Sequence, residues 1–536
     1  MTRELDSLRS YRVSEAQKSL WLAQKITPEM PIIPASRWLI EGEIDERLLR
    51  TALRIVFREN SAARVNFRQL DDELRQVVRE GDDSWEPFFH DVSDDDDPEA
   101  SGRARAAAIE REPFDLERDL LFRAGIIRLS ASRHLLVLAA HHIVADGYTL
   151  GQLLPLRTAE CYRALRQGTA IPARPESGPE EIYREDLRYR NSPQFTEDAA
   201  FWQSYLADAP EALRLPGERS SDRPAALHRT LAVPAADTSA WFKAAASINV
   251  RMPAFLTAAA TVFFRHLSGR QDFTFSMTGL GRTEAARSFY GSQATLLPVR
   301  AHAPLSARFH DVAHALSDEL RRVREHSTHQ VSDIRLGAGA ALEKESVASP
   351  FGATLNILPF VRPVDFDGAR ASMQPGSSWG AIDDLHFGIY YDGRARSDLH
   401  VRVDADSTSY SEDDVDRLAA TLVAFVNGVA RDPQAAIGSV DVLGPGERER
   451  VLGAVNDTAV DTPEVTVPEL VARRAAVAPE AVAVVFEDQR LTYAELEARA
   501  DRLARELTGR GVRSETLVGL ALPRSADLVV AMLAGR

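Results

Sequence analysis

The segment from residue 134 to residue 165 constrains this chain most, because it specifies a strand, a turn and a helix in succession. The apolar run LLVLAA predicts a strand that ends at the first of two histidines, and YTLGQLLPLRTAECYRAL predicts the following helix. Between them lies HHIVADG, His141 to Gly147, so both histidines stand at the mouth of a strand-to-helix turn. A histidine there can take or pass a proton near neutral pH.

The composition indicates a folded protein with several domains. At 536 residues, with 44% apolar and 27% charged residues, the chain is too long for one core, and two to four domains are expected. No apolar run approaches the roughly 20 residues that a membrane span needs, and the N-terminus lacks the apolar stretch of a signal peptide. A net charge of −15 without a basic stripe argues against a nucleic-acid partner.

Cysteine and metal chemistry are predicted to be minor. The single cysteine, Cys161, allows no internal disulfide and fits a reducing cytoplasm. A zinc site made of His141, His142 and Asp146 is disfavoured, because adjacent histidines leaving a strand point to opposite faces and no fourth ligand is evident. The acidic run DDDDP, Asp94 to Pro98, is expected to be a solvated loop before a helix. We therefore expect no metal site and no cofactor bound by the chain itself.

The first α/β lobe is predicted to span residues 1–175. Its helices are expected at Ser14–Gln24, with the serine as N-cap, and at Glu46–Asn60, where one face carries Leu49, Leu53, Val56 and Phe57. Strands are expected at Arg64–Phe67, Leu121–Leu129 and His134–Ala140.

A second α/β lobe is predicted over residues 176–445, after a stretch rich in Pro, Gly and Glu, Arg166 to Glu181. An apolar helix (Ala254–Gly269), an apolar segment (Phe351–Phe360) and paired strands in LHFGIYYDG and LHVRVDAD mark this lobe. A linker at 446–465 is expected to separate a tail, 466–536, made of a hairpin, a helix capped by Thr492 and Glu495, a strand in LVGLALP and the start of another helix.

Six segments in this order resemble the core motifs of the condensation domain of nonribosomal peptide synthetases, in the chloramphenicol-acetyltransferase-like superfamily. The resemblance covers residues 10–445 and rests on Ser14–Gln24, Glu59–Phe67, HHIVADG, Phe289–Arg300, His329–Gly339 and Phe351–Phe360. The chain departs from the family at Ala63 (usually leucine), Thr295 (often asparagine) and Tyr148-Thr149 (commonly tryptophan and serine). None of these departures removes a charged or proton-carrying group.

The resemblance implies a fold of two α/β chloramphenicol-acetyltransferase-like lobes that form a V-shaped pseudo-dimer, with a tunnel between them. It implies that His142 positions an attacking amine and serves as general base, whereas His141 packs or hydrogen-bonds structurally. Asp146 is expected to form a buried ion pair with Arg64 rather than to act as a base. A second group of residues is expected near the developing oxyanion: the backbone N–H of Gly147 and the side-chain amide of Asn356.

The expected reaction does not need a strong base. An α-amine titrates near pH 8, so much of it is already neutral at pH 7. Holding two tethered substrates head-on is therefore expected to matter more, because positioning can contribute about 7–11 kcal/mol, whereas a general base contributes about 10²- to 10⁴-fold.

The tail resembles the start of an adenylation domain, since LTYAEL (Leu491–Leu496) is similar to that family's first core motif. The later adenylation motifs are absent, so no aminoacyl adenylate is expected from this chain. No carrier-domain serine motif is present, so phosphopantetheine is expected to arrive on donor and acceptor carrier proteins. The expected enzyme is a cytoplasmic monomer without nucleic-acid or membrane partners.

Other functions remain open on the sequence alone. An epimerising relative shares HHxxxDG but usually follows a carrier domain, whereas a heterocyclising relative would carry DxxxxD. A stand-alone acyl-coenzyme A transferase is disfavoured by the adenylation-like tail. A non-catalytic recruitment platform of the same fold would have a damaged histidine motif or a blocked tunnel.

Overall fold

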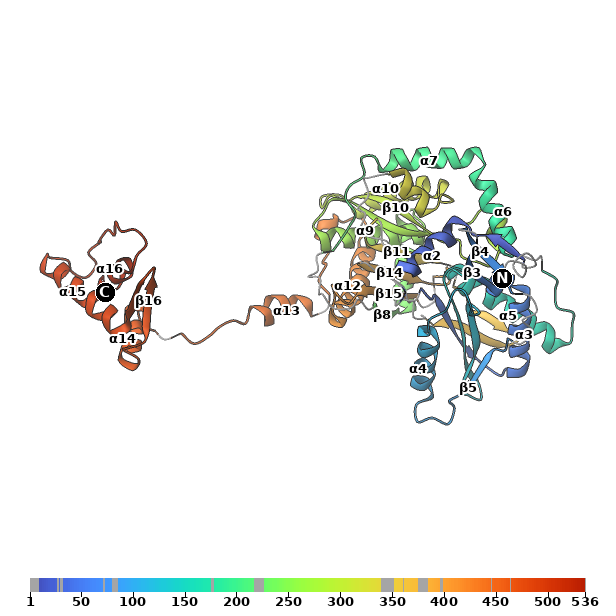
Figure 1. Ribbon diagram of the computed structural model, residues 1–536, viewed down its shortest axis with the longest axis horizontal. Helices are drawn as coiled ribbons and strands as arrows, with labels where there is room; N and C mark the ends of the chain where they lie inside the picture. The colour runs from blue at the N-terminus through green and yellow to red at the C-terminus, as the bar shows by residue number, and fades with distance from the viewer. Residues whose placement is uncertain are drawn as a thin grey trace. The chain divides into compact units, whose positions relative to one another are not determined.

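The computed structural model divides the chain into two compact units, residues 1–449 and 450–536 (Figure 1). The structure describes residues 9–26, 28, 32–70, 73–79, 85–174, 178–215, 226–338, 351–359, 361–374, 384–395, 399–444, 446–462 and 464–535.

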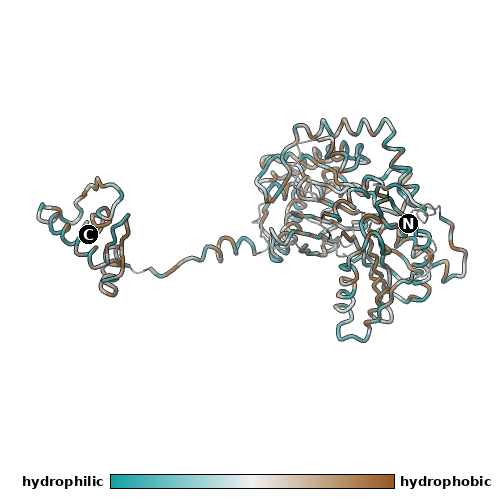
Figure 2. Tube along the Cα trace, viewed as in Figure 1, coloured by the Kyte–Doolittle hydropathy of each residue, from teal (hydrophilic) through white to brown (hydrophobic). Residues whose placement is uncertain are grey.

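The first unit contains two lobes, each built on a six-stranded mixed sheet. The N-terminal sheet has the order β12-β13-β2-β7-β6-β5. Only β5 and β6 pair in parallel. Its strands are β12 (Val364–Phe366), β13 (Ala369–Gln374), β2 (Ala35–Glu41), β7 (Arg133–Ala140), β6 (Phe122–Ser130) and β5 (Phe88–Asp91). The central strand β7 has six successive apolar residues, LLVLAA, all buried, as expected for a strand covered on both faces, and brown segments run through this lobe in Figure 2.

Helices cover both faces of the N-terminal sheet. Ile126 contributes to the core shared with α3 (Glu46–Glu59) and α5 (Leu154–Gln167), whereas its neighbour Ile127 contributes to the core beside α4 (Pro98–Arg111). This alternation follows from the two-residue period of a strand. A three-stranded antiparallel sheet lies at the side of the lobe and consists of β1 (Ser10–Arg12), β4 (Glu73–Val78) and β3 (Val65–Leu70).

The C-terminal lobe has its own sheet and core. The strand order is β10-β9-β11-β14-β15-β8, and β11 runs parallel to both of its neighbours. Its strands are β10 (Thr295–His302), β9 (Asp272–Gly279), β11 (Thr354–Leu358), β14 (Leu385–Tyr390), β15 (Leu399–Asp406) and β8 (Ala226–Val233). Its helices are α6 (Pro179–Arg190), α7 (Pro193–Leu206), α8 (Ala235–Ser247), α9 (Met252–Ser268), α10 (Phe309–Glu325), α11 (Val331–Ala338) and α12 (Glu412–Arg431).

Strand exchange runs in one direction, from the stretch predicted as the second lobe into the sheet of the first, and the predicted domain bounds do not anticipate it. Residues 364–374 lie inside the stretch predicted as the second lobe, yet β13 pairs antiparallel with β2 and β12 pairs with β13. Phe366 is fully buried in the N-terminal core. The reason is local: β2 would otherwise be an exposed edge with unpaired N–H and C=O groups, and the returning hairpin covers it. The exchange ties the lobes into one unit.

Most elements predicted in the first unit are confirmed. Helix α2 (Glu15–Ile26) begins after Ser14, whose hydroxyl accepts the Gln17 N–H at 3.3 Å while the Gln17 side chain accepts the Ser14 N–H at 3.0 Å. Helix α3 buries all four side chains predicted for its inner face. The hairpin β6–β7, the pair β14–β15 and the apolar helix α9 are also present. Each of these elements has a strong period or cap in its own sequence.

The second unit is a small α/β fragment. It contains α14 (Val467–Val477), a hairpin of β16 (Val482–Phe486) and β17 (Gln489–Thr492), α15 (Tyr493–Gly509) and α16 (Ala526–Ala534). Helix α13 (Glu447–Leu452) spans the boundary at residue 450. The predicted capping box is confirmed, since the Thr492 hydroxyl accepts the Glu495 N–H. The strand predicted in LVGLALP is wrong: among the described residues no strand pairs with 517–523, and Leu517 is 99% exposed.

No single described helix is long and apolar enough to cross a membrane. Helices α8 and α9 meet the length and composition requirement together, but they are bent by 97° at the break between them.

Candidate functional site

The HHIVADG loop is fastened by its backbone at the end of β7. The N–H of His141 donates to the Leu121 carbonyl at 3.0 Å, and the N–H of His142 donates to the Ile32 carbonyl at 2.8 Å. The Val144 N–H then closes a turn on the His141 carbonyl at 3.0 Å. These bonds fix the directions in which the two imidazoles leave the strand, and the histidines consequently have different environments.

His142 is half-buried and faces the second lobe. Its Nδ1 lies 3.2 Å from the hydroxyl of Ser292, which is 150 residues away in the sequence and 1% exposed. No partner for Nε2 is recorded among the described residues, so this nitrogen remains available to a substrate. Ser292 lies in the segment Phe289–Arg300, but its role was not predicted, because a lone serine in a loop carries no signal of its distant partner.

We expect Ser292→Ala to lower kcat for the reaction that uses His142 by roughly tenfold while changing KM little. A freed ring samples other orientations, and small misplacements of a catalytic group reduce rates strongly. Ser292→Cys, which keeps a weak hydrogen-bonding group of similar volume, should give an intermediate kcat. Steady-state kinetics of the three proteins make the comparison. A purely structural serine would instead lower the melting temperature and leave kcat per folded molecule unchanged.

His141 is buried, and both of its ring nitrogens are hydrogen-bonded. Its Nδ1 accepts the Ile143 N–H at 3.1 Å, so the neutral ring carries its proton on Nε2 and donates it to the Gln24 side-chain oxygen at 3.1 Å. Burial, and next the neighbouring His142, lower the pKa of His141 to about 3. The ring therefore links the loop to α2 as a neutral group and does not exchange protons near pH 7.

This buried ring predicts an acid-sensitive stability. The folded pKa of about 3 lies below the unfolded value near 6.5, so the unfolded state binds more protons between these limits. The contribution is fully present above about pH 6.5 and is lost as the pH falls toward 3. Relative to His141→Gln, which cannot titrate, the wild-type protein should lose about 2 kcal/mol of unfolding free energy between pH 7 and pH 5. Urea unfolding at both pH values measures the difference, and parallel pH profiles would contradict it.

Asp146 pairs with Arg282, and the predicted pair with Arg64 is wrong. One Arg282 nitrogen, Nη2, lies 2.9 and 2.8 Å from the two carboxylate oxygens, and both side chains are 1% exposed. Arg64 follows α3 and instead donates to the carbonyl of Arg58, six residues before it, at 3.1 Å. This local carbonyl, left without a helical partner at the end of α3, accepts one N–H of Arg64, whereas the buried Nε of Arg64 has no hydrogen-bond partner among the described residues. The ion pair therefore joins the two lobes rather than two parts of the first lobe.

Asp146 also caps the helix that follows it. Its Oδ1 accepts the Thr149 N–H at 2.8 Å, and its Oδ2 accepts the Gln293 N–H at 3.1 Å. Burial alone would raise the pKa of Asp146, but the Arg282 charge and these N–H donors outweigh it and leave the pKa below its ordinary value. The carboxylate therefore stays ionised near neutral pH.

Gly147 and Asn356 lie in different lobes. Gly147 is exposed, its φ is not positive, and a Cβ added there would meet no atom within 4 Å, so the turn itself does not require glycine. It is the first residue of the helix, so its N–H has no intrahelical acceptor. Asn356 is half-buried in β11, opposite Gly388 of β14. No contact between Asn356 and the HHIVADG loop is recorded among the described residues.

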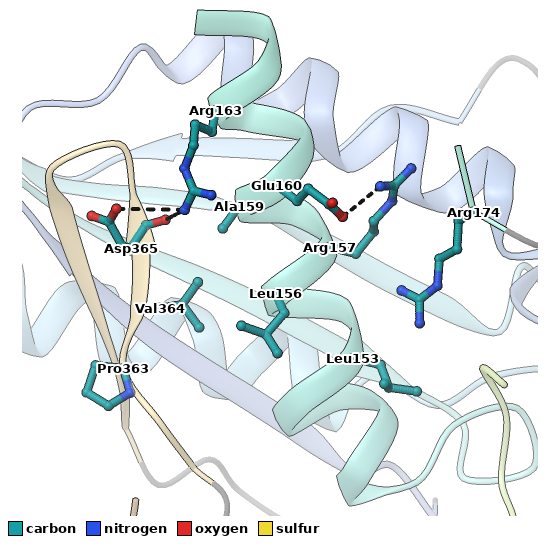
Figure 3. A pocket seen from close by; sticks show the side chains of 10 residues that line it. All are labelled: Leu153, Leu156, Arg157, Ala159, Glu160, Arg163, Arg174, Pro363, Val364 and Asp365. Atoms are coloured by element: carbon teal, nitrogen blue, oxygen red, sulfur yellow. Dashed lines mark hydrogen bonds and ion pairs between the residues drawn. The ribbon is translucent and has the colours of Figure 1, made fainter. Parts of the chain in front are cut away.

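Two cavities lie away from His142. The cavity in Figure 3 measures about 360 Å³ and lies between α5 and the β12 segment. Two of its three lining arginines have acidic partners, as Arg157 contacts Glu160 and Arg163 contacts Asp365, whereas Arg174 donates to the Tyr290 hydroxyl. The other, of about 390 Å³, lies in the C-terminal lobe beside α8 and α9. Within the described parts of the chain, no group of three or more His, Cys, Asp or Glu side chains could hold a metal ion.

The chain matches two protein-family models. The family model described as "Condensation domain" matches residues 7–452, and the model described as "AMP-binding enzyme" matches residues 471–535. The chain belongs to the condensation-domain family. Its second unit is the beginning of an AMP-binding domain, as its resemblance to adenylation domains indicated. The recognition made from the motifs is thereby confirmed.

Curated relatives of this condensation-domain chain are peptide synthetases. It is 29% identical over 525 residues to a dimodular nonribosomal peptide synthase of Bacillus subtilis (strain 168), covering 98% of this chain and 22% of the relative. It is 27% identical over 524 residues to an isonitrile lipopeptide synthase of Streptomyces coeruleorubidus, covering 97% of this chain and 35% of the relative. The chain thus spans well under half the length of these relatives.

Solved condensation domains share the fold of the first unit. The first condensation domain of the calcium-dependent antibiotic synthetase, in complex with a substrate analogue, has a TM-score of 0.72 at 27% identity and covers 81% of this chain and 98% of its own. A starter condensation domain of rhizomide synthetase, in complex with C8-CoA and Leu-SNAC, has a TM-score of 0.72 at 25% identity, with 81% of this chain and 97% of its own covered. The predicted fold class is confirmed.

Proposed function

We propose that this condensation domain joins a donor acyl or peptidyl thioester to the amine of an acceptor aminoacyl thioester, with both substrates on phosphopantetheine arms of carrier proteins. The amine attacks the donor carbonyl, the C–N bond forms, and the C–S bond breaks to release the donor thiol. His142 takes the proton that the amine loses and passes it to the departing thiolate. The observation that supports this most strongly is the fixed imidazole of His142, with Nδ1 beside Ser292 and Nε2 available.

The ionised pair behind the histidine supports the same assignment. Asp146 and Arg282 neutralise one another and hold the loop, and the neutral His141 ring is hydrogen-bonded at both nitrogens, which leaves His142 as the group within HHIVADG that can serve as a base. In the tautomer with hydrogen on Nδ1, the Ser292 hydroxyl accepts that hydrogen, and Nε2 is a base. We further propose that the Gly147 N–H and the Asn356 amide stabilise the oxyanion, because both groups are hydrogen-bond donors without a recorded partner in the described chain.

An assay with loaded carrier proteins tests the proposal. The first pair is an octanoyl group on the donor carrier and a leucyl group on the acceptor carrier, chosen to match the C8-CoA and Leu-SNAC in the complex of the rhizomide synthetase starter domain. Mass spectrometry of the acceptor arm should show an added acyl mass that depends on this chain. The assay is then repeated with a panel of other acyl groups on the donor carrier and other aminoacyl groups on the acceptor carrier, because each combination is a separate pair of substrates.

The same assay separates the rival activities. Transfer from free octanoyl-coenzyme A as fast as from the donor carrier would indicate a stand-alone acyltransferase. Exchange of the α-hydrogen of a peptidyl thioester in heavy water, without amide formation, would indicate epimerisation. Binding of loaded carriers without any reaction across the panel would indicate a recruitment platform. We also propose a cytoplasmic location, as suggested by the single, free and buried thiol of Cys161.

A further inference from the structure

Thr149 is a buried side chain of the first lobe that holds a backbone segment of the second lobe. Its hydroxyl donates to the Gly291 carbonyl at 2.9 Å, and the Gly291 N–H approaches the same hydroxyl oxygen at 3.4 Å. Thr149 is 0% exposed and lies 142 residues from Gly291 in the sequence. It is the first residue of a π-helical segment, Thr149–Leu153, and single π-helical turns are frequent at functional sites. The contact therefore links the helix behind HHIVADG to the other lobe.

Gly291 has a backbone conformation that favours glycine. Its φ is +146°, and a Cβ added there would lie 2.5 Å from Cδ1 of Ile182 in α6. A side chain at this position would therefore strain the backbone and push against α6. The absence of a side chain lets the Gly291 peptide lie between α6 and the Thr149 hydroxyl. The residue that follows this fixed peptide is Ser292, the partner of His142.

Ser292 is held on both sides by side chains that follow His142 in the sequence. The residue before it is bonded to Thr149, and the Gln293 N–H after it donates to Oδ2 of Asp146 at 3.1 Å. The Ser292 hydroxyl lies 3.2 Å from Nδ1 of His142, and no other hydrogen bond of this hydroxyl is recorded among the described residues. Because the backbone is anchored before and after the serine, its hydroxyl keeps one position beside the imidazole.

We propose that Thr149 is a positioning residue for His142 and acts through Gly291 and Ser292. The threonine hydroxyl holds the Gly291 peptide, and the peptide places the Ser292 hydroxyl. That hydroxyl in turn fixes Nδ1, so that Nε2 of His142 is presented to the substrate. Thr149 is fully buried, and its role is therefore to orient the base and not to react. Its effect on catalysis rests on the proposed function, whereas its effect on the orientation of the imidazole does not.

Thr149→Val removes the hydroxyl and keeps the shape of the side chain. The Gly291 carbonyl also accepts Nη2 of Arg282 at 2.9 Å, so it keeps a partner and the variant should fold. We expect kcat for amide formation to fall about three- to tenfold with KM nearly unchanged, because the loss of one neutral hydrogen bond lets the relay shift. Thr149→Ser, which retains the hydroxyl, should recover at least about half of the wild-type kcat.

Thr158→Val is the matched control. Thr158 is also 0% exposed, but its hydroxyl donates to the Leu154 carbonyl within α5 at 2.8 Å and does not contact the second lobe. This variant loses the same chemical group from a buried threonine, and it should retain the wild-type kcat.

Nitrogen NMR of histidine-labelled protein measures the orientation of the ring without turnover. The signals of His142 are assigned by their loss in His142→Ala, and the spectra are recorded at a pH where the ring is neutral. In the wild type the two ring nitrogens should have the well-separated shifts of one tautomer. In Thr149→Val the two shifts should move toward each other, as in a ring that exchanges between tautomers, and Ser292→Ala should cause the same change. Thr149→Ser and Thr158→Val should keep the wild-type separation.

Thr149→Val combined with Ser292→Ala tests whether the threonine acts through the serine. Ser292→Ala already breaks the relay, so the double variant should have the kcat of Ser292→Ala alone. The proposal is overturned if Thr149→Val lowers kcat by the same factor in both backgrounds, if it leaves the His142 shifts unchanged, or if Thr158→Val has the same effects. If no substrate pair yields an amide, the proposed function fails, and the NMR comparison still decides whether Thr149 orients His142.

Discussion

Replacing His142 with alanine should reduce the rate of amide formation by about 10²- to 10⁴-fold, the range that a positioned general base contributes. The half-buried ring is held at Nδ1 by Ser292 and leaves Nε2 as the accessible nitrogen. Because its Nδ1 bond is a single contact to one hydroxyl, its loss should not unfold the protein. Residual product is expected, since the carriers would still bring the two thioesters together.

Single-turnover kinetics with both carriers loaded measure this loss without interference from carrier exchange. His302→Ala is the matched control, because His302 is exposed at the end of β10 and its contact is to Asp272. This variant should retain the wild-type rate. If His142→Ala keeps more than about a tenth of the wild-type rate, the imidazole is not the base, and positioning by the carriers accounts for the reaction.

The local parts of this molecule were predictable from the sequence. Apolar residues every three to four positions indicate helix α3, and a serine N-cap indicates helix α2. Each helix is therefore specified within about fifteen residues of sequence. The same holds for the strand and helix that flank HHIVADG. The histidine motif could therefore be placed correctly at the end of a strand from its neighbouring residues alone.

The partners of that motif were not predictable in this way. Ser292 and Arg282 lie 150 and 136 residues from the groups they contact, and nothing in their neighbouring sequence says which groups those are. The resemblance to the family offered Arg64 as the partner of Asp146, but Arg64 satisfies the carbonyl of Arg58 close by. The exchange of β12 and β13 between lobes was missed for a related reason, since a strand's own residues do not say which sheet edge it covers.

Replacing Arg282 with methionine should destabilise the first unit by about 3–5 kcal/mol, because it leaves the Asp146 carboxylate buried and unpaired. The loss should be larger than for an ordinary buried hydrogen bond, since Nη2 of Arg282 also donates to Thr149 at 3.0 Å and to the Gly291 carbonyl at 2.9 Å. Amide formation should fall as well, because the same loop carries His142. Urea unfolding followed by a probe specific to the first unit measures the stability.

Arg64→Met distinguishes the Asp146–Arg282 pair from the Asp146–Arg64 pair expected from the sequence. It removes one hydrogen bond to a carbonyl and should cost about 0.5–1.5 kcal/mol, well below the effect of Arg282→Met. Asp146→Asn combined with Arg282→Met should be less destabilising than the sum of the two single changes, since the second change removes the charge that the first leaves unpaired. Two outcomes would contradict the Asp146–Arg282 pair: unfolding free-energy losses that simply add for changes at Asp146 and Arg282, or losses that do not add for changes at Asp146 and Arg64. The second outcome would favour the Asp146–Arg64 pair expected from the sequence. The inter-lobe pair would then carry little of the stability assigned to it, and the loop that presents His142 would depend on the first lobe alone.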